Sequence, residues 1–235
     1  MNAPLWTLDE IAAATGARVG AGFTQATGAS IDTRTLEPGD LYFAIKGDVH
    51  DGHDFVPAAL EKGASAAVVS EDKAAAFEES DRLIVVPDVL EAMRQLGRAA
   101  RKRTNAKIVA ITGSVGKTGT KEAMRLALSA QGATHASVAS YNNHWGVPLT
   151  LVRMPRETEF GVFEIGMNHA YEILPLTSMV RPHVAVITTV EPVHIEFFRS
   201  IWAIADAKGE IFSGIEPGGT AVILRDSPYF ERLRA

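Results

Sequence analysis

The feature that most restricts the fold of this chain is a glycine- and lysine-containing turn between two segments of different periodicity. Before the turn, residues 107–112 (KIVAIT) are apolar and rich in β-branched side chains, which predicts a short buried strand. Apolar residues at helical spacing follow the turn, at Ala123, Leu126, Ala127 and Ala130. They predict a helix that begins near Lys117. A strand, a glycine-containing turn and a helix in this order are the context that a phosphate-binding loop requires.

The turn also has the chemistry of an anion site. It reads G-x-x-G-K-T from Gly113, whereas the longer standard pattern would need glycine where the chain has Ile111. Backbone N–H groups at a helix N-terminus lack partners, and glycine lets the backbone approach a phosphate closely. Lys117 could reach the β- and γ-phosphates, and the Thr118 hydroxyl could ligate Mg²⁺. An ordinary glycine-rich turn is the alternative, but the flanking strand and helix favour nucleotide binding.

Composition excludes several other classes of protein. The 235 residues are 46% hydrophobic and carry a net charge of −5, so neither nucleic acid nor an anionic membrane surface is a predicted partner. The basic cluster at 98–107 is interpreted as a helix C-terminus. The absence of cysteine excludes disulfides and thiolate metal sites and favours a cytoplasmic location. We expect no signal peptide, and no stretch reaches the ~18 apolar residues of a membrane span.

The first part of the chain is predicted to form a small α/β domain. Thr7 and Glu10 form a capping-box pattern for a helix that ends at Gly16. Short apolar segments predict strands at 40–47, 66–70 and 82–87, with a helix at 54–62. We place the end of this domain at residue 87, where Asp88 and Glu91 begin a helix that links it to a second domain, 88–235.

The second domain is predicted to contain a mainly parallel sheet covered on both faces, with strands at 107–112, 160–165, 183–189 and 220–225. Ligands bind beyond the carboxyl ends of such strands, where Glu164 and residues 188–194 lie. A buried Glu164 needs a partner, and an arginine and Mg²⁺ are equally good candidates. By themselves, His194 is interpreted as a loop or core histidine and Lys208 as a solvated helix lysine.

Several segments together resemble the Mur ligase family, ATP-dependent amide ligases that build the peptide of bacterial cell-wall precursors. Residues 31–55 are similar to the UDP-sugar-binding domain of that family. The motifs that resemble its central domain follow in order: TGSVGKT (112–118), YNNHWGVPLTL (141–151), FEIGMN (163–168), TTVEPVHIEFF (188–198) and AKGEIF (207–212). Val115 and Gly119 depart from the family, in which asparagine and threonine or serine are frequent there, so side-chain contacts are lost while backbone contacts remain.

The resemblance implies a fold and an activity. It implies a small N-terminal α/β domain that binds a UDP-sugar, followed by a phosphate-loop ATPase domain with a mainly parallel sheet. Relative to the family, the central domain is incomplete and the C-terminal domain is absent, so we expect this chain to be inactive as a ligase by itself. We also expect it to be a monomer. The motif variants are most similar to the member that joins D-alanyl-D-alanine to UDP-N-acetylmuramoyl-tripeptide, in peptidoglycan synthesis, through an acyl phosphate.

The resemblance also implies site residues, with ATP and Mg²⁺ as cofactors. Lys117, Lys208 and His194 would be catalytic, with Lys208 carbamylated. The nucleotide would be bound by Gly113, Ser114, Val115, Gly116, Lys117, Thr118 and Gly119. Metal ligands would be Thr118, Glu164, His194 and Lys208. Substrate contacts would be Ser30, Thr33, Lys46, Gly47, Asp51, Gly52, His53, Asn142 and Asn143.

Besides a simple phosphoryl-transfer enzyme, which remains open because phosphate loops serve many chemistries, two other functions are alternatives at this point. A ligase similar to folylpolyglutamate synthase would share the ATPase core, although residues 31–55 argue against it. A non-catalytic fragment that binds UDP-sugar and nucleotide is the second alternative.

Overall fold

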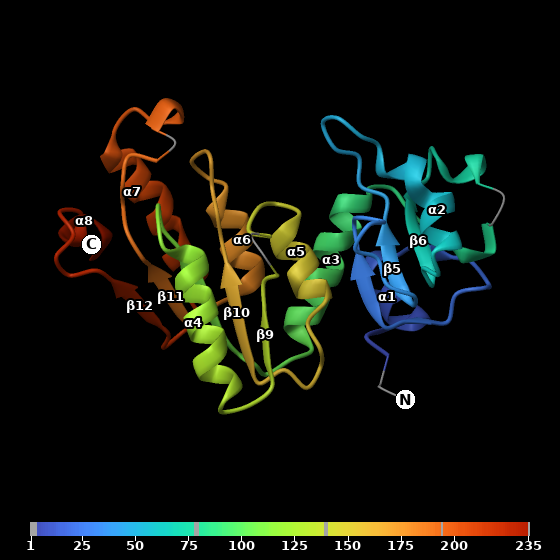
Figure 1. Cartoon of the computed structure of the whole chain (residues 1–235), viewed down its shortest axis with the longest axis horizontal. Coiled ribbons are helices and arrows are strands. Elements are labelled where there is room, and N and C mark those ends of the chain that lie inside the picture. The colour runs from blue at the N-terminus through green and yellow to red at the C-terminus, as the bar shows by residue number, and fades with distance from the viewer. Residues whose placement is uncertain (1–3, 78–79, 139–140, 194, 235) are drawn as a thin grey trace. The chain divides into compact units, whose positions relative to one another are not determined.

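The chain forms two compact units, each with its own β-sheet (Figure 1). The structure is a computed structural model that describes residues 4–77, 80–138, 141–193 and 195–234. The units are Met1–Ala100 and Arg101–Ala235. Their boundary falls inside α3 (Val89–Lys102), whereas the sequence placed it before this helix. The Glu91 N–H donates a hydrogen bond of 2.7 Å to Asp88, as expected for the predicted start of this helix.

The N-terminal unit is built on a five-stranded sheet in the order β2-β7-β6-β5-β4. All neighbours are parallel except β2 and β7. The strands are β2 (Arg18–Val19), β4 (Gly28–Ser30), β5 (Asp40–Phe43), β6 (Ala66–Ser70) and β7 (Leu83–Val86). A separate antiparallel pair joins β1 (Trp6–Thr7) and β3 (Gln25–Ala26). The predicted strand at 40–47 therefore ends early, at Phe43.

Helices of the N-terminal unit follow the local sequence signals. Helix α1 (Leu8–Thr15) has the predicted capping box between Thr7 and Glu10, and Gly16 closes it in the left-handed conformation. The predicted helix at 54–62 is a 3-10 turn (Gly52–Phe55) that continues into α2 (Val56–Glu61). Two further 3-10 turns are Ala74–Ala76 and Ser80–Arg82.

The C-terminal unit has a sheet in the order β12-β11-β8-β10-β9, in which every pair is parallel. This confirms the predicted parallel sheet. The strands are β8 (Lys107–Thr112), β9 (Thr134–Ala136), β10 (Phe160–Glu164), β11 (Val184–Ile187) and β12 (Thr220–Ile223). Strand β9 was not predicted. Because the strands are parallel, their carboxyl ends lie at one edge, where the 113–118 loop, Glu164 and residue 188 follow them.

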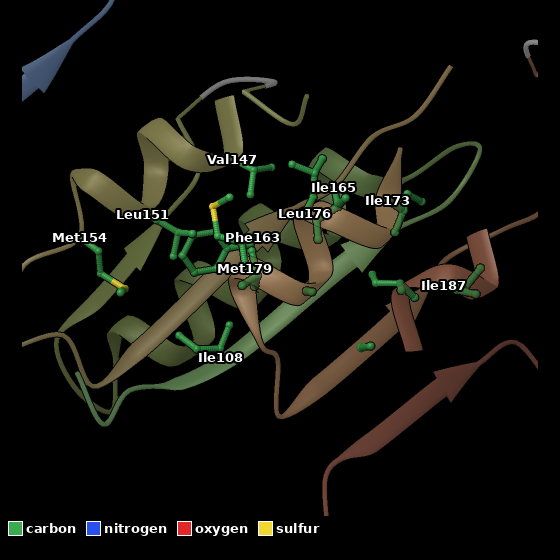
Figure 2. Close-up of a cluster of buried hydrophobic side chains, with 14 of the residues drawn as sticks. Ile108, Val147, Leu151, Met154, Phe163, Ile165, Ile173, Leu176, Met179 and Ile187 are labelled. Carbon is green, nitrogen blue, oxygen red and sulfur yellow. The ribbon is translucent and has the colours of Figure 1, made fainter. Parts of the chain in front are cut away.

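Helices cover both faces of this sheet, because successive strand residues point to opposite sides. Ile108 and Ala110 of β8 pack with side chains from α5 (Gly146–Val152), α6 (Ile173–Val180) and α7 (Ile201–Gly209) (Figure 2). Val109 and Ile111 face the other way and pack against Met124 and Leu128. These last two lie on α4 (Lys117–Ser129), which crosses that face in Figure 1. The remaining helices are the 3-10 turns Ile195–Phe197 and Glu210–Gly214, and α8 (Phe230–Arg234).

The start of α4 was predicted correctly, but the apolar residues that predicted it do not form its buried face. Ala123, Leu126, Ala127 and Ala130, from which the helix was inferred, are all exposed. Met124 and Leu128 are partly buried, and Lys121 is fully buried, with its ammonium donating to the carbonyl oxygen of Ser137 at 2.9 Å. Across the described residues, no helix combines the length and apolarity needed to cross a bilayer.

Candidate nucleotide and metal site

The loop between β8 and α4 is shaped for an anion. Gly116 precedes α4 with φ 89°, and no side chain caps the helix, so its first N–H groups remain available to a ligand. Gly113 has φ 149°, and a Cβ there would overlap Oγ1 of Thr188. Only glycine combines this backbone conformation with so close a neighbour.

The segment after β11 fixes the conformation of this loop. Thr188 Oγ1 donates to the Val115 carbonyl oxygen at 2.6 Å. The Ser114 N–H donates to the Thr189 carbonyl oxygen at 2.9 Å, and the Val115 N–H donates to Thr189 Oγ1 at 3.1 Å. Glu191 adds a further pair of hydrogen bonds with Ser114. The side-chain roles of Thr188 and Thr189 were not predicted, because no local pattern links residues so far apart in the sequence.

Lys117 is folded back onto its own loop. Its ammonium donates to the carbonyl oxygens of Gly113 at 2.7 Å and Ser114 at 3.4 Å. Burial lowers the pKa of Lys117, and the negative charge of Glu164 partly offsets that shift. The lysine therefore lies at the loop with its charge satisfied by carbonyl oxygens that a phosphate group could replace.

Glu164 ends β10 as a buried carboxylate that is 1% exposed. Thr118 Oγ1 donates to its Oε2 at 2.9 Å, and the side-chain amide of Asn142 donates to its Oε1 at 2.8 Å. Of the two partners considered from the sequence, an arginine is therefore wrong for the part of the chain that the structure describes. Two neutral donors satisfy the oxygens and leave the negative charge in place.

This donor set fits Mg²⁺. The ion prefers oxygen ligands, keeps several waters, and needs only one or two protein groups when it also binds phosphate oxygens. Thr118 and Glu164 supply such groups. Within the described ranges, no cluster of three or more His, Cys, Asp or Glu side chains could hold a metal. The third expected ligand, His194, lies outside the described residues.

Lys208 on α7 is buried and not solvated. The residue is 5% exposed, and burial lowers its pKa to about 8, with the positive charge of Lys117 as the second cause. The interpretation as an ordinary solvated lysine is therefore wrong. Carbamylation and metal binding at Lys208 remain predictions.

The two asparagines predicted as substrate contacts have internal partners. Asn142 donates to Glu164, as described above. Asn143 Oδ1 accepts hydrogen bonds from the N–H groups of Trp145 at 3.1 Å and Gly146 at 2.9 Å, at the start of α5. Contact of either asparagine with a substrate remains a prediction.

The N-terminal unit gathers its predicted substrate residues at the carboxyl edge of β4 and β5. Ser30 is buried and donates to the Asp32 carbonyl oxygen at 3.0 Å, while the carbonyl oxygen of Thr33 accepts from Lys62 at 2.9 Å. Lys46 is exposed and pairs through its backbone with Asp51. The Gly47 N–H donates to the carbonyl oxygen of His50 at 2.8 Å, so the segment forms a compact loop.

His53 orders this loop from within. Its Nδ1 lies 2.6 Å from Asp51 Oδ1, and its Nε2 accepts the Ser70 N–H at 3.0 Å. A backbone N–H can only donate, so Nε2 must be the unprotonated nitrogen that accepts it. Nδ1 therefore carries the ring proton of neutral His53. The adjacent Gly52 is needed because a Cβ would lie 2.6 Å from the Ile45 carbonyl oxygen.

The hydroxyl of Tyr42 contacts the Lys46–His53 segment of this edge. Its hydroxyl donates to the Gly52 carbonyl oxygen at 3.0 Å. Burial, followed by the charges of Asp32 and Asp51, raises the pKa of Tyr42 to about 12. Both acidic residues therefore lie near one phenol, which brings the Ser30–Thr33 segment and the Lys46–His53 segment to one place.

Comparisons with known proteins agree across the chain. The model of the Mur ligase middle domain matches residues 111–235, and that of the Mur ligase family, catalytic domain, matches residues 25–101. A UDP-N-acetylmuramoyl-tripeptide–D-alanyl-D-alanine ligase of Rickettsia prowazekii is 37% identical over 202 residues, which are 86% of this chain and 44% of that protein. The chain thus spans less than half the length of this curated relative.

Solved structures give the same result. A crystal structure of MurF from Acinetobacter baumannii has a TM-score of 0.85 and 32% identity, and the match covers 99% of this chain and 51% of that one. MurF ligase from Thermotoga maritima in complex with ADP has a TM-score of 0.74 and 29% identity, over 87% of this chain and 47% of that one. Since the middle-domain model alone covers more than half of its residues, this chain belongs to the Mur ligase family.

Proposed function

We propose that the chain is part of an ATP-dependent amide ligase that joins D-alanyl-D-alanine to UDP-N-acetylmuramoyl-tripeptide in peptidoglycan precursor synthesis. The observation that carries the proposal is the hydrogen bond between Thr118, in the 113–118 loop, and the buried Glu164. It joins a phosphate-binding loop to a carboxylate suited to Mg²⁺. Relatives that bear the name of this ligase support the choice of substrates. We assign the reaction to the cytoplasm, with the monomer as the acting unit.

In this proposal the C-terminal unit holds and activates ATP. The free N–H groups at the start of α4 and the ammonium of Lys117 would bind the phosphates, and Thr118 and Glu164 would hold Mg²⁺. The cation would neutralise charge on the phosphoryl group as it is transferred to the substrate carboxylate. His194 and Lys208 are proposed to complete the metal site. With a pKa of about 8, Lys208 has about a tenth of its amine neutral at pH 7, which is the form that reacts with CO₂.

The N-terminal unit is proposed to bind the UDP-sugar at the carboxyl edge of β4 and β5. The ammonium of exposed Lys46 is suited to phosphate or uracil oxygens, and the loops that carry Thr33 and Gly47 are proposed to line the same site. Buried Ser30 and His53 are suited to holding the loops in place, because the structure already engages their polar atoms within the unit.

The test is calorimetric titration of this 235-residue chain with ADP and Mg²⁺, and separately with UDP-N-acetylmuramoyl-tripeptide. We expect both to bind, and we expect Lys117→Ala to abolish nucleotide binding without loss of fold. Arg125→Ala is the matched control, because Arg125 is a half-exposed cation on the same helix that pairs with Glu122. Unchanged ADP affinity in Lys117→Ala would count decisively against the nucleotide site.

Ligation itself is the second measurement. With ATP, UDP-tripeptide and D-alanyl-D-alanine, we expect no product from this chain alone, because the reaction needs the acyl phosphate and amine held together with water excluded. Product formed by the purified chain would contradict that expectation. Binding of folate in place of UDP-tripeptide would redirect the proposal to a ligase similar to folylpolyglutamate synthase.

A further inference from the structure

We propose that Asn142 is a positioning residue of the metal site, whose side-chain amide holds the Glu164 carboxylate so that Oε2 is presented to Thr118 and to a divalent cation. The inference rests on the proposed nucleotide function and adds to it a role for a residue that the sequence assigned to substrate contact.

The two oxygens of Glu164 are divided between two donors. Asn142 Nδ2 donates to Oε1 at 2.8 Å, while Thr118 Oγ1 donates to Oε2 at 2.9 Å. A carboxylate held at both oxygens has its plane fixed, which a single hydrogen bond would not achieve. The side chain is 1% exposed, so water offers little competition for these contacts.

Asn142 is itself held in place by the segment that follows β10. The Gly166 N–H donates to the Asn142 carbonyl oxygen at 2.8 Å. A Cβ on Gly166 would lie 2.8 Å from Asn142 Oδ1, so glycine is needed for this approach. The backbone of Asn142 is therefore anchored by Gly166, which lies two residues beyond Glu164, and its amide meets the carboxylate from a fixed position.

The choice of a neutral donor has an electrostatic consequence. Lysine or arginine at position 142 would satisfy Oε1 equally well but would cancel the charge of Glu164. The amide of Asn142 satisfies the oxygen and leaves the negative charge able to attract a cation. Thr118 meanwhile spends its proton on Oε2, which leaves the lone pairs of its hydroxyl oxygen free for the same cation.

The adjacent asparagine provides a matched control. Asn143 Oδ1 accepts the N–H groups of Trp145 and Gly146 and so caps the start of α5. The same substitution at the two positions therefore separates loss of metal positioning from loss of local structure.

The experiment measures Mn²⁺, as a surrogate for Mg²⁺, by electron paramagnetic resonance on this chain with bound ADP. We expect Asn142→Ala to weaken Mn²⁺ binding about tenfold, the lower end of the effect of losing a partner of a metal ligand. ADP binding measured in excess chelator should change less than about twofold, because the loop and Lys117 are intact. Asn143→Ala should keep the Mn²⁺ affinity and lower the melting temperature.

A swapped pair guards against loss of fold. In Asn142→Asp with Glu164→Gln, the donor and acceptor exchange places, so the hydrogen bond and the net charge remain while the carboxylate leaves Thr118. We expect this double variant to melt near the wild type and to bind Mn²⁺ as weakly as Asn142→Ala.

The outcomes separate the two proposals. Wild-type Mn²⁺ affinity in Asn142→Ala, or in the swapped pair, overturns the positioning role. Retained Mn²⁺ affinity with lost binding of UDP-N-acetylmuramoyl-tripeptide would make Asn142 a substrate contact instead. If the wild-type chain binds no Mn²⁺ and ADP at all, the proposed nucleotide function fails, and the positioning role fails with it.

Discussion

Replacing Gly113 by alanine tests whether the 113–118 loop has the conformation that the structure gives it. The new methyl group would overlap Thr188 Oγ1, and its distance to both Cβ and N of Thr188 would be 3.1 Å. The φ of 149° would also strain any residue with a Cβ. Strained backbone of this kind costs about 1–3 kcal/mol and overpacking a similar amount, so we expect a loss of roughly 2–6 kcal/mol in the free energy of unfolding.

The two causes can be separated by a second substitution. Thr188→Ala removes the overlapping oxygen but leaves the φ angle and the backbone contact. In that background, Gly113→Ala should cost at least about 1 kcal/mol less than in the wild type, since the two residues touch and their effects cannot simply add. It should still destabilise, because the strained backbone remains.

The assay is equilibrium urea unfolding, with amide hydrogen exchange in β8 and α4 to assign the transition to the C-terminal unit. Gly119→Ala is the control, because nothing lies within 4 Å of its Cβ position. Because Gly119 is an exposed glycine inside α4, its replacement by alanine should raise the free energy of unfolding by about 0.5–1 kcal/mol. A cost below about 0.5 kcal/mol for Gly113→Ala, or an equal cost with and without Thr188, would refute the reasoning.

Three further predictions concern ionisable side chains that are buried or partly buried. Lys208→Met should raise the melting temperature of the metal-free chain, because it removes an ammonium that burial and Lys117 disfavour; a lower melting temperature would contradict this. His53→Ala should lose about 2–4 kcal/mol in urea unfolding, because a partly buried carboxylate and a partly buried N–H lose their partner, whereas exposed Asp54→Ala should lose little. Burial, then Arg101 and Lys107, lowers the pKa of His183 below 6.5, so the unfolded chain takes up the proton first and stability should fall as pH drops below that value. Urea midpoints at pH 5.5 and 7.5 check this, and His183→Asn should lessen the difference.

The sequence predicted the parts of the fold that are determined locally. Strand β8 and the start of α4 agree because an apolar β-branched run and a glycine–lysine turn carry their own conformational preference. Strand β9 was missed, since Thr134, His135 and Ala136 have no strand pattern and are ordered by pairing with β10. Tertiary contacts outweigh propensity in so short a segment.

The sequence also did not predict which charged side chains are buried. The helix was predicted from Ala123, Leu126, Ala127 and Ala130, which are all exposed, whereas Lys121 lies inside, where Ser137 and Glu122 satisfy its ammonium. Lys208 is likewise buried, although its charge predicted a solvated helix lysine. In the site, the resemblance already placed Thr118 and Glu164 together, but the hydrogen bond from Asn142 to Glu164 could not be predicted, because the two residues come from segments with no common pattern.

The contact between Thr188 and Val115 has a consequence for the order of folding. These residues are 73 positions apart, so their hydrogen bond closes a long loop. The chain loses the entropy of loop closure before the contacts across the loop can stabilise it. The residues of strand β8 and helix α4 are synthesised well before residues 188–191. We therefore expect the loop to reach its final geometry only when β11 docks beside β8. A nucleotide that recognises this geometry would bind to the assembled sheet and not to the fragment of β8 and α4. Its binding would therefore stabilise the sheet in which β11 has docked beside β8.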